Sequence, residues 1–480
     1  MKSPFSQVPS SSSAEWDTQS GPDSFRHLKP FVLLMVLWEF LLVLAASLFS
    51  PPMGEIAQTI GVSSSLMGNF PLLNSLFFHS LAMPLAAVLM LVTLGAFGIR
   101  GRLGGFVLCA ATLGGILASG MMAYILVSGG DTLSYGLMYV GMALEAAAAL
   151  SLLVALWPRR VPDAAMKLAG RSLTGLTMWV TVAAALVAVT LGSYAASANG
   201  QWNPSTAVGQ MLGMESAHEN MVLIVVGAAI VVLVAKWFKI EEYDGTPGLF
   251  AKVGLYGTLI GIPVVVASML VAAPTATGPT GDLTIFSGIL LQASLFVMFA
   301  VMHEEAKRLH VRGPLGVLRE ALTFGMLFVL FWVNIAVTLP GIYVAVNLAR
   351  FNGQYLGYYY RQVFAIGHEH ALVVLLAISL MMLVALMYRV KGIVGALAGL
   401  TMTVGYVVCT VANVLFIFFL VPNGSTFISY MSDGIALMFV GVLLALVGIA
   451  FSRGGPKRPP ADGEPSMPLS SGKKLESAAQ

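Results

Sequence analysis

Residues 104–127 read GGFVLCAATLGGILASGMMAYILV and contain no charged side chain. A helix of about 20 apolar residues crosses about 30 Å of hydrocarbon, so this stretch predicts a transmembrane helix. On both sides of it, runs of the same character recur between polar or Gly/Pro-rich connections. The twelve predicted spans cover residues 31–49, 72–97, 104–127, 134–157, 174–196, 209–235, 251–273, 283–303, 321–349, 364–388, 393–421 and 429–452.

The composition agrees with a chain that lies mostly in the membrane. Of its 480 residues, 58% are hydrophobic and 10% are charged, against roughly 25% charged in soluble domains. The net charge of +3 leaves no basic excess for nucleic acid. Cys109 and Cys409 lie inside apolar runs, which excludes a disulfide framework and Cys-based zinc or iron–sulfur sites. We expect a multi-pass protein of the cell (plasma) membrane.

Both chain ends are polar. Residues 1–29 and 453–480 are rich in Ser and Pro, so we expect disordered tails around a twelve-helix membrane domain at 30–452. Lysines and arginines occur in every connection from an even to an odd span, and on the opposite side only Arg350 and Arg361 occur. Cationic loops stay cytoplasmic. The predicted fold is an all-α integral membrane bundle with both termini in the cytoplasm.

Four of the seven histidines lie in the outer part of predicted spans: His79 in the second, His218 in the sixth, and His368 and His370 in the tenth, whereas His303 ends the eighth span beside a basic cytoplasmic loop. These spans run from outside to inside, and each of the four histidines follows a few residues after its span begins. At about 1.5 Å per residue the four share one depth. Residues two apart on a helix point in nearly opposite directions. His368 and His370 could therefore face two hemes, each with an axial imidazole.

This pattern resembles the catalytic subunit of the heme-copper oxidase superfamily, which includes terminal oxygen reductases and nitric oxide reductases. The resemblance covers nearly all of the membrane region. It implies that His79 and His370 hold a low-spin heme, that His368 holds a high-spin heme, and that His218 binds a nonheme iron or copper. The stretches TLPGIY at 338–343 and GHEHAL at 367–372 are most similar to the nitric oxide reductase branch. The electron donor would be a small partner subunit, cytochrome c or quinol.

One departure concerns the nonheme metal. The family carries a His-His pair in its seventh span, whereas residues 262–275 here read IPVVVASMLVAAPT. Glu215 and Glu219 flank His218, and carboxylate oxygens suit iron better than copper. They are therefore candidates to complete a mixed His/Glu site, with solvated acids at the outer interface as the alternative interpretation.

Three further polar residues are candidates for function. Glu145 lies deep in the fourth span, where we expect a buried, protonated acid or a member of a proton relay. Arg350 and Arg361 flank a tyrosine-rich stretch that leads to His368. Arginine forms bidentate bonds with carboxylates, so both are candidates to anchor heme propionates. An interfacial Arg/Tyr belt is the alternative interpretation of this pair.

Three functions remain open from the sequence. The first is a respiratory oxidoreductase that reduces oxygen or nitric oxide, and the second is a degenerate diheme cytochrome that only transfers electrons. The third is a twelve-helix secondary transporter, although transport gives no reason for four histidines at one depth.

Overall fold

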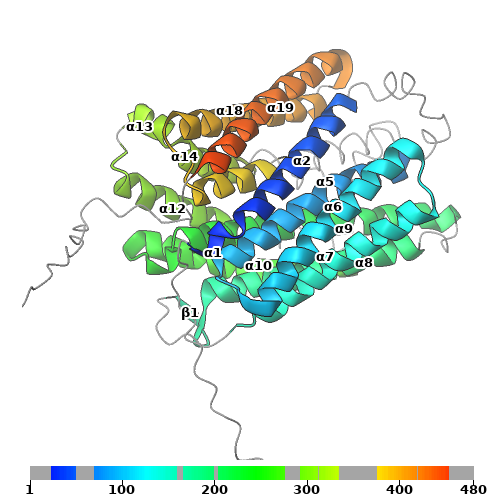
Figure 1. The fold of residues 1–480 in the computed structure, drawn as a ribbon, viewed down its shortest axis with the longest axis horizontal. Helices are drawn as coiled ribbons and strands as arrows, with labels where there is room; N and C mark the ends of the chain where they lie inside the picture. The colour runs from blue at the N-terminus through cyan, green and yellow to red at the C-terminus, as the bar shows by residue number, and fades with distance from the viewer. Residues whose placement is uncertain are drawn as a thin grey trace, which may run out of the picture.

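The computed structural model of the chain describes residues 23–49, 70–158, 166–198, 204–275, 292–311, 313–333, 374, 376–418 and 420–452. Almost all of these residues are helical, and the long helices lie side by side (Figure 1). The chain is a predominantly α-helical, multi-pass membrane protein.

The described elements follow one another as a series of long helices with short connections. The first half holds α1 (Asp23–Arg26), α2 (Lys29–Phe49), α5 (Phe70–Ala96), α6 (Gly101–Ser128), α7 (Thr132–Ala155), β1 (Lys167–Leu168), β2 (Arg171–Ser172), α8 (Leu173–Ala198) and α9 (Pro204–Trp237). The second half holds η2 (Ile240–Glu242), α10 (Gly245–Thr275), α12 (Ser294–Arg308), α13 (Gly313–Arg319), α14 (Ala321–Val333), the unlabelled helix Leu376–Met387, α18 (Gly392–Phe418) and α19 (Leu420–Phe451).

Each of the twelve predicted spans contains described helical residues. Within the described part of the chain, seven helices are long and apolar enough to cross a membrane. The number is eight if α13 and α14, which meet at 97°, form one broken span. The described residues therefore establish a multi-pass bundle, and the full count of twelve spans stays a prediction.

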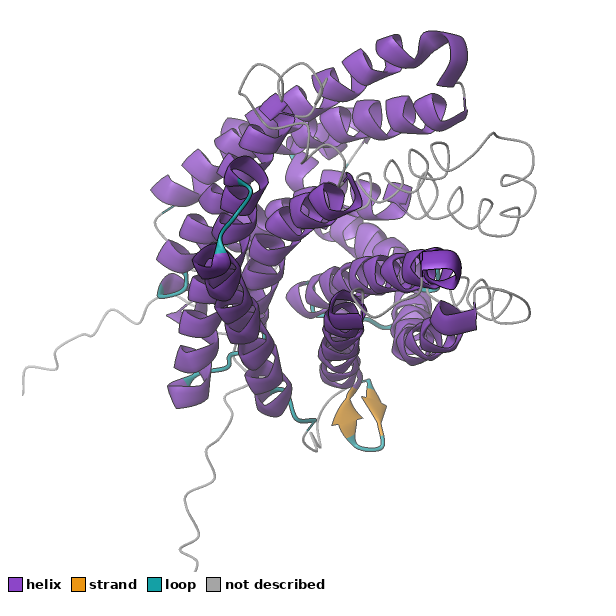
Figure 2. Cartoon of the chain, turned by 90° about the vertical axis from the view of Figure 1, so that its right-hand side faces the viewer, coloured by secondary structure: helices purple, strands orange, loops and turns teal. Residues whose placement is uncertain are grey.

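Two connections differ from plain loops. The short strands β1 and β2 pair antiparallel in the connection between α7 and α8 and lie outside the helices at one end (Figure 2). α12 continues to Arg308, past the apolar run predicted to end at residue 303. A bidentate ion pair between Arg308 and the buried Glu305, one turn apart, stabilises this polar extension.

The helices close a ring. Following the packed neighbours, the ring passes from α2 through α6, α7, α8, α10, α12, α14, α18 and α19 and returns to α2. In Figure 1, α2 accordingly lies between α19 and α5. The amino group of Lys29 closes the ring by donating to the carbonyl oxygens of Ala450 (3.1 Å) and Ser452 (2.8 Å). A cation is favourable there because the last carbonyls of a helix carry partial negative charge.

The basic connections gather at one end of the bundle, which we call the basic end. Lys29 is bonded to Ser452 at this end, and Phe25, shortly before Lys29 in the chain, packs against Tyr388, the residue next to Arg389. The carboxylate of Glu241 accepts hydrogen bonds from the Ser172 hydroxyl (2.7 Å) and the Thr174 amide (2.8 Å). These bonds join the connection that follows α9 to the β1–β2 hairpin with its Lys167 and Arg171.

The opposite end is represented by the turn between α6 and α7. Gly129 there adopts a left-handed conformation (φ 82°), which glycine reaches without steric cost. Asp131 caps α7, because its carboxylate accepts from the Ser134 amide (2.7 Å) while the Ser134 hydroxyl accepts from the Asp131 amide. The Ser134 amide bond is the main reason why the pKa of Asp131 lies below its ordinary value. Residues 128–133 contain no Lys or Arg.

Candidate functional site: three interior helices

The three segments predicted to carry histidines form the interior of the ring. In α5, 72% of the stretch His79–Ala96 is buried, against 28% of Thr132–Ala155 in the peripheral α7. In α9, every residue of 228–235 is buried, and ten of the twelve residues of Leu376–Met387 are buried as well. A helix that is apolar all round belongs in the interior of such a bundle, and cofactor sites in helix bundles are built from inward-facing side chains.

These three helices end in one layer at the basic end. The Phe25 ring packs edge-on against Tyr388 with 6.3 Å between the ring centroids, and the Tyr388 hydroxyl donates to the Phe25 carbonyl (3.2 Å). Phe25 also fills the space that a side chain on Gly95 of α5 would need. The Lys236 amino group of α9 lies 5.5 Å from the centroid of the Phe97 ring, directly after α5. α5 and α9 therefore run in the same direction with adjacent C-terminal ends.

Three of the predicted histidines precede residues of this layer by the same number of positions in the sequence. His79 precedes Phe97 by 18 residues, His218 precedes Lys236 by 18, and His370 precedes Tyr388 by 18. For α5 and α9, which are continuous helices, this separation corresponds to about 27 Å at about 1.5 Å per residue. His79 and His218 are thus placed at the same height on two packed helices.

A second contact relates α9 to the helix Leu376–Met387. A side chain on Gly227 would meet the Leu376 side chain at 3.5 Å, so the two helices pass each other at these residues. His218 precedes Gly227 by nine residues, and His368 precedes Leu376 by eight. His368 lies outside the described residues, so the facing of His218 and His368 that the family resemblance implies stays a prediction.

The side chains of most candidates lie outside the described part of the structure. Glu215, His218 and Glu219 are on α9, with only their backbone described, whereas Arg350, Arg361, His368 and His370 fall outside the described residues. The His79 side chain is partly buried on α5, next to the buried Ser80. Among the described residues no group of three or more His, Cys, Asp or Glu could hold a metal ion.

Glu145 is described fully and lies where four helices meet. It is on α7 and only 6% exposed. A methyl carbon placed on Gly115 of α6 would lie 3.0 Å from the Glu145 Oε1 atom, 2.8 Å from Cε of Met35 on α2 and 3.0 Å from Cβ of Ala87 on α5. The expectation of a buried acid in the fourth span is confirmed, while its role stays a prediction.

The sequence reasoning missed a second acid of this kind, Glu39 on α2. Both of its carboxylate oxygens are buried, and neither has a hydrogen-bond partner among the described residues. The available signal was that Glu39 is the only charged residue between Phe31 and Phe49. An ionisable residue inside a span is costly, so it is a candidate for function wherever it occurs.

Comparisons with known proteins add no family assignment. No protein-family model matches the chain, and no curated protein or solved structure is significantly similar to it.

Proposed function

We propose that the chain is a heme-binding subunit of a membrane respiratory oxidoreductase, resembling the catalytic subunits of terminal oxidases and nitric oxide reductases. The observation that carries the proposal is the common layer in which the three interior helices end. Counted from that layer, His79, His218 and His370 have the same chain separation. Transport or simple packing requires no such register.

The chemistry of the donor set fits heme. Neutral imidazole is a common axial ligand of heme iron, and the four histidines belong to apolar predicted spans. His79 and His370 would hold one heme, and His368 would hold a second. His218, with Glu215 and Glu219, would offer one nitrogen and carboxylate oxygens to a nonheme metal. Arg350 and Arg361 would hold propionates by charge-assisted hydrogen bonds. When bound, heme supplies one-electron chemistry at iron.

The proposal extends to orientation. The basic end would face the cytoplasm, because cationic connections stay on that side. With twelve spans both termini would then be cytoplasmic, and the histidines would lie nearer the outer surface of the cell membrane. Electrons would arrive from a small partner subunit, cytochrome c or quinol.

An optical spectrum of the purified protein with a pyridine hemochrome assay tests heme content directly. The expected result is a sharp alpha band on reduction, which His79→Ala abolishes because a six-coordinate heme needs both imidazoles. His303→Ala is the matched control, since His303 lies in α12 outside the histidine register, and it should leave the band unchanged. A protein without heme absorbance contradicts the proposal and favours a secondary transporter.

Metal analysis of the same sample separates the two heme-based functions. About one iron beyond every two hemes supports a retained nonheme site, because such a site needs several strong ligands to hold its metal. Heme iron alone leaves an electron-transfer cytochrome and contradicts gas reduction at a nonheme centre.

A further inference from the structure

Two carboxyl groups of the N-terminal helices have buried oxygen atoms without a hydrogen-bond partner among the described residues. Oε1 of Glu145 and both carboxylate oxygens of Glu39 are shielded from solvent, and none of the three accepts a hydrogen bond among the described residues. Buried polar groups in proteins are nearly always hydrogen-bonded, so unpaired ones call for an explanation. The heme proposal uses neither side chain.

The surroundings of Glu145 are apolar and tightly packed. The Glu145 carboxyl group lies over Gly115, and the nearest side chains at that point are Met35 and Ala87. Gly114 lies under the Glu145 side chain as well, since a methyl carbon there would be 2.8 Å from its Cγ. Two glycines of α6 thus create the space that the acid occupies.

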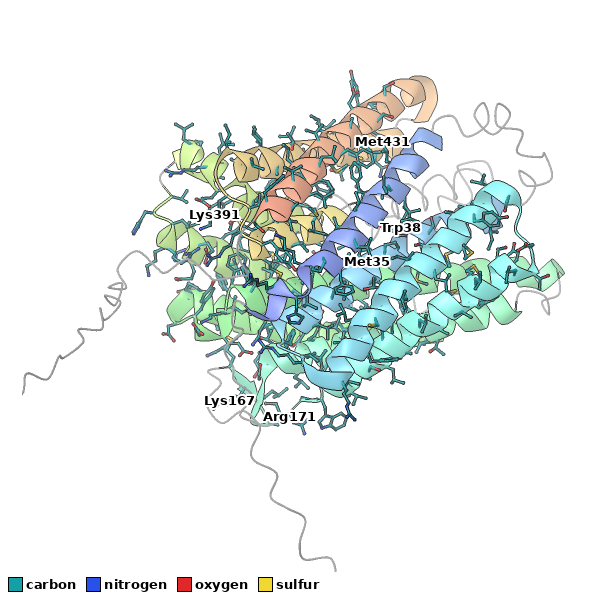
Figure 3. All side chains as sticks on the ribbon, in the orientation of Figure 1. Met35, Trp38, Lys167, Arg171, Lys391 and Met431 are labelled. Carbon is teal, nitrogen blue, oxygen red and sulfur yellow. The ribbon has the colours of Figure 1, made fainter. Side chains whose placement is uncertain are left out.

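Glu39 belongs to the same group of helices. It follows Met35 by one helical turn, so the two residues share a face of α2. The rotation of α2 is fixed on either side of Glu39: the Trp38 indole donates to the Ser119 hydroxyl of α6 (2.8 Å), and Phe40 packs edge-on against Phe439 of α19. Figure 3 labels Met35 and Trp38 on this part of α2.

Among the described residues, no cation faces the two acids from the helices packed around them. The membrane portions of these helices carry a few other titratable groups. His79 is two turns from Ala87 on α5, Cys109 is exposed on α6, Tyr124 is exposed on α6, Tyr135 and Tyr139 are in the outer part of α7, and Tyr430 and Asp433 are exposed on α19. Lys29 begins α2 at the basic end and is bonded to the end of α19.

The protonated form of both acids follows from this environment. An isolated carboxylate in an apolar medium is far more costly than a neutral carboxylic acid, so such a group retains its proton. A metal cation is a poorer occupant, because hard cations require several oxygen ligands, whereas the side chains that meet Glu145 Oε1 over Gly115, Met35 and Ala87, offer none.

We propose that Glu39 and Glu145 form an intramembrane proton-binding site in the helix group α2, α5, α6 and α7, in which two carboxylic acids hold protons and exchange them with water. Glu39 follows Lys29 by ten residues, which places it about 15 Å into the bundle from the basic end, near half the thickness of the hydrocarbon. A proton bound there has left bulk water without crossing the membrane. The site requires neither heme nor a nonheme metal.

Infrared difference spectroscopy on the full-length protein in lipid nanodiscs tests the proposal. Exchange from H2O to D2O should shift carbonyl bands of protonated carboxylic acids. Glu39→Gln and Glu145→Gln should each remove one band, because glutamine keeps the size of the side chain and cannot hold the acid proton. Glu242→Gln is the matched control: the Glu242 side chain is 65% exposed at the basic end, and the variant should keep both bands. Ionised carboxylates in the wild type would overturn the proposal.

Dicyclohexylcarbodiimide provides an independent measurement, because it reacts with protonated carboxylic acids in apolar surroundings. Peptide mapping should find the adduct at Glu39 and Glu145, with less labelling as the pH rises and equal labelling in sodium and choline chloride. Protection by sodium at constant pH would reassign the site to a metal cation. Since the bands and the label are measured without reference to heme, a heme-free preparation that still shows both contradicts the proposed function alone.

Discussion

The N-terminal hairpin α6–α7 and the C-terminal hairpin α18–α19 are built in the same way around glycine. A side chain on Gly141 of α7 would collide with the Ala118 backbone nitrogen of α6 and lie 2.9 Å from its Cα. A side chain on Gly434 of α19 would lie 2.6 Å from the Cys409 backbone nitrogen of α18. Small residues let helix backbones approach closely in membranes, where van der Waals packing drives association.

The two hairpins differ in their buried acids. In the C-terminal hairpin the one acidic residue, Asp433 of α19, is exposed, and the buried Thr410 hydroxyl of α18 accepts from the Trp332 indole of α14 (3.0 Å) and donates to the Tyr406 carbonyl (2.9 Å). In the N-terminal hairpin Glu145 is buried, and its Oε1 atom has no hydrogen-bond partner among the described residues. Close packing of a hairpin therefore does not require an acid in its seam. Glu145 is unexplained by packing, and this is why its presence indicates a function.

The largest effect is expected from substitutions that disrupt the close glycine contacts in both hairpins. Gly141→Ala and Gly434→Ala should each lower the free energy of unfolding by about 1–3 kcal/mol, because the added methyl forces two backbones apart. Thermal unfolding in detergent measures this change. Gly136→Ala is the matched control on α7: nothing lies within 4 Å of the added carbon, so its stability should not fall. Equal midpoints for all three variants would show that the close approaches are not tight.

A smaller effect on stability is expected to distinguish the buried Glu145 of the N-terminal hairpin from the buried Thr410 of the C-terminal hairpin. Glu145→Met should leave stability unchanged or raise it by about 1 kcal/mol, because an unpaired buried polar group costs roughly that much and methionine has a similar volume. Thr410→Val should lower stability by about 1 kcal/mol, since the Trp332 indole N–H loses its acceptor. Thermal unfolding of both variants gives the comparison. Destabilisation by Glu145→Met as large as by Thr410→Val would mean that Glu145 has a structural partner.

The smallest expected effect is the loss, at low pH, of the stability that the Asp131 cap of α7 provides. Bonding to Ser134 holds the pKa of Asp131 below its unfolded value, so its stabilisation is complete above the unfolded pKa and disappears as the pH falls through the folded pKa. Asp131→Asn keeps a capping oxygen and removes the charge. The wild type should therefore exceed this variant in midpoint temperature near neutrality, and the difference should vanish in acid. A constant difference at every pH would assign the effect to hydrogen bonding alone.

Much of the fold could be predicted from the sequence because membrane thickness limits the length of an apolar helix. Residues 104–127 and 134–157 were predicted as spans, and α6 and α7 occupy 101–128 and 132–155. The sequence-based prediction of the fold fails where polar interactions extend a helix or order a connection between helices. The Glu305–Arg308 ion pair extends α12, and the bond from Ser172 to Glu241 fixes a hairpin that no hydrophobic pattern indicates.

The candidate site was only partly predictable. Counting residues along apolar runs gives depth, so the shared height of His79 and His218 could be derived before the helices were placed. Which helices are interior could not be derived, because the runs that form α5 and α7 are both predominantly apolar. Glu39 could be singled out from the sequence as the only charged residue of its span, but the burial of its carboxylate oxygens without a partner among the described residues required the structure.

The bridge from Lys29 to the carbonyls of Ala450 and Ser452 gives the described helices a circular order. Neither α2 nor α19 is an edge of the bundle, because each has a packed neighbour on both sides. Deleting α2 or α19 would therefore expose the interior helices to lipid along the whole length of the missing helix, whereas an open row of helices would lose only its last member. In topological terms, the chain is linear but the bundle is cyclic, so its first and last helices are as indispensable as those in the middle.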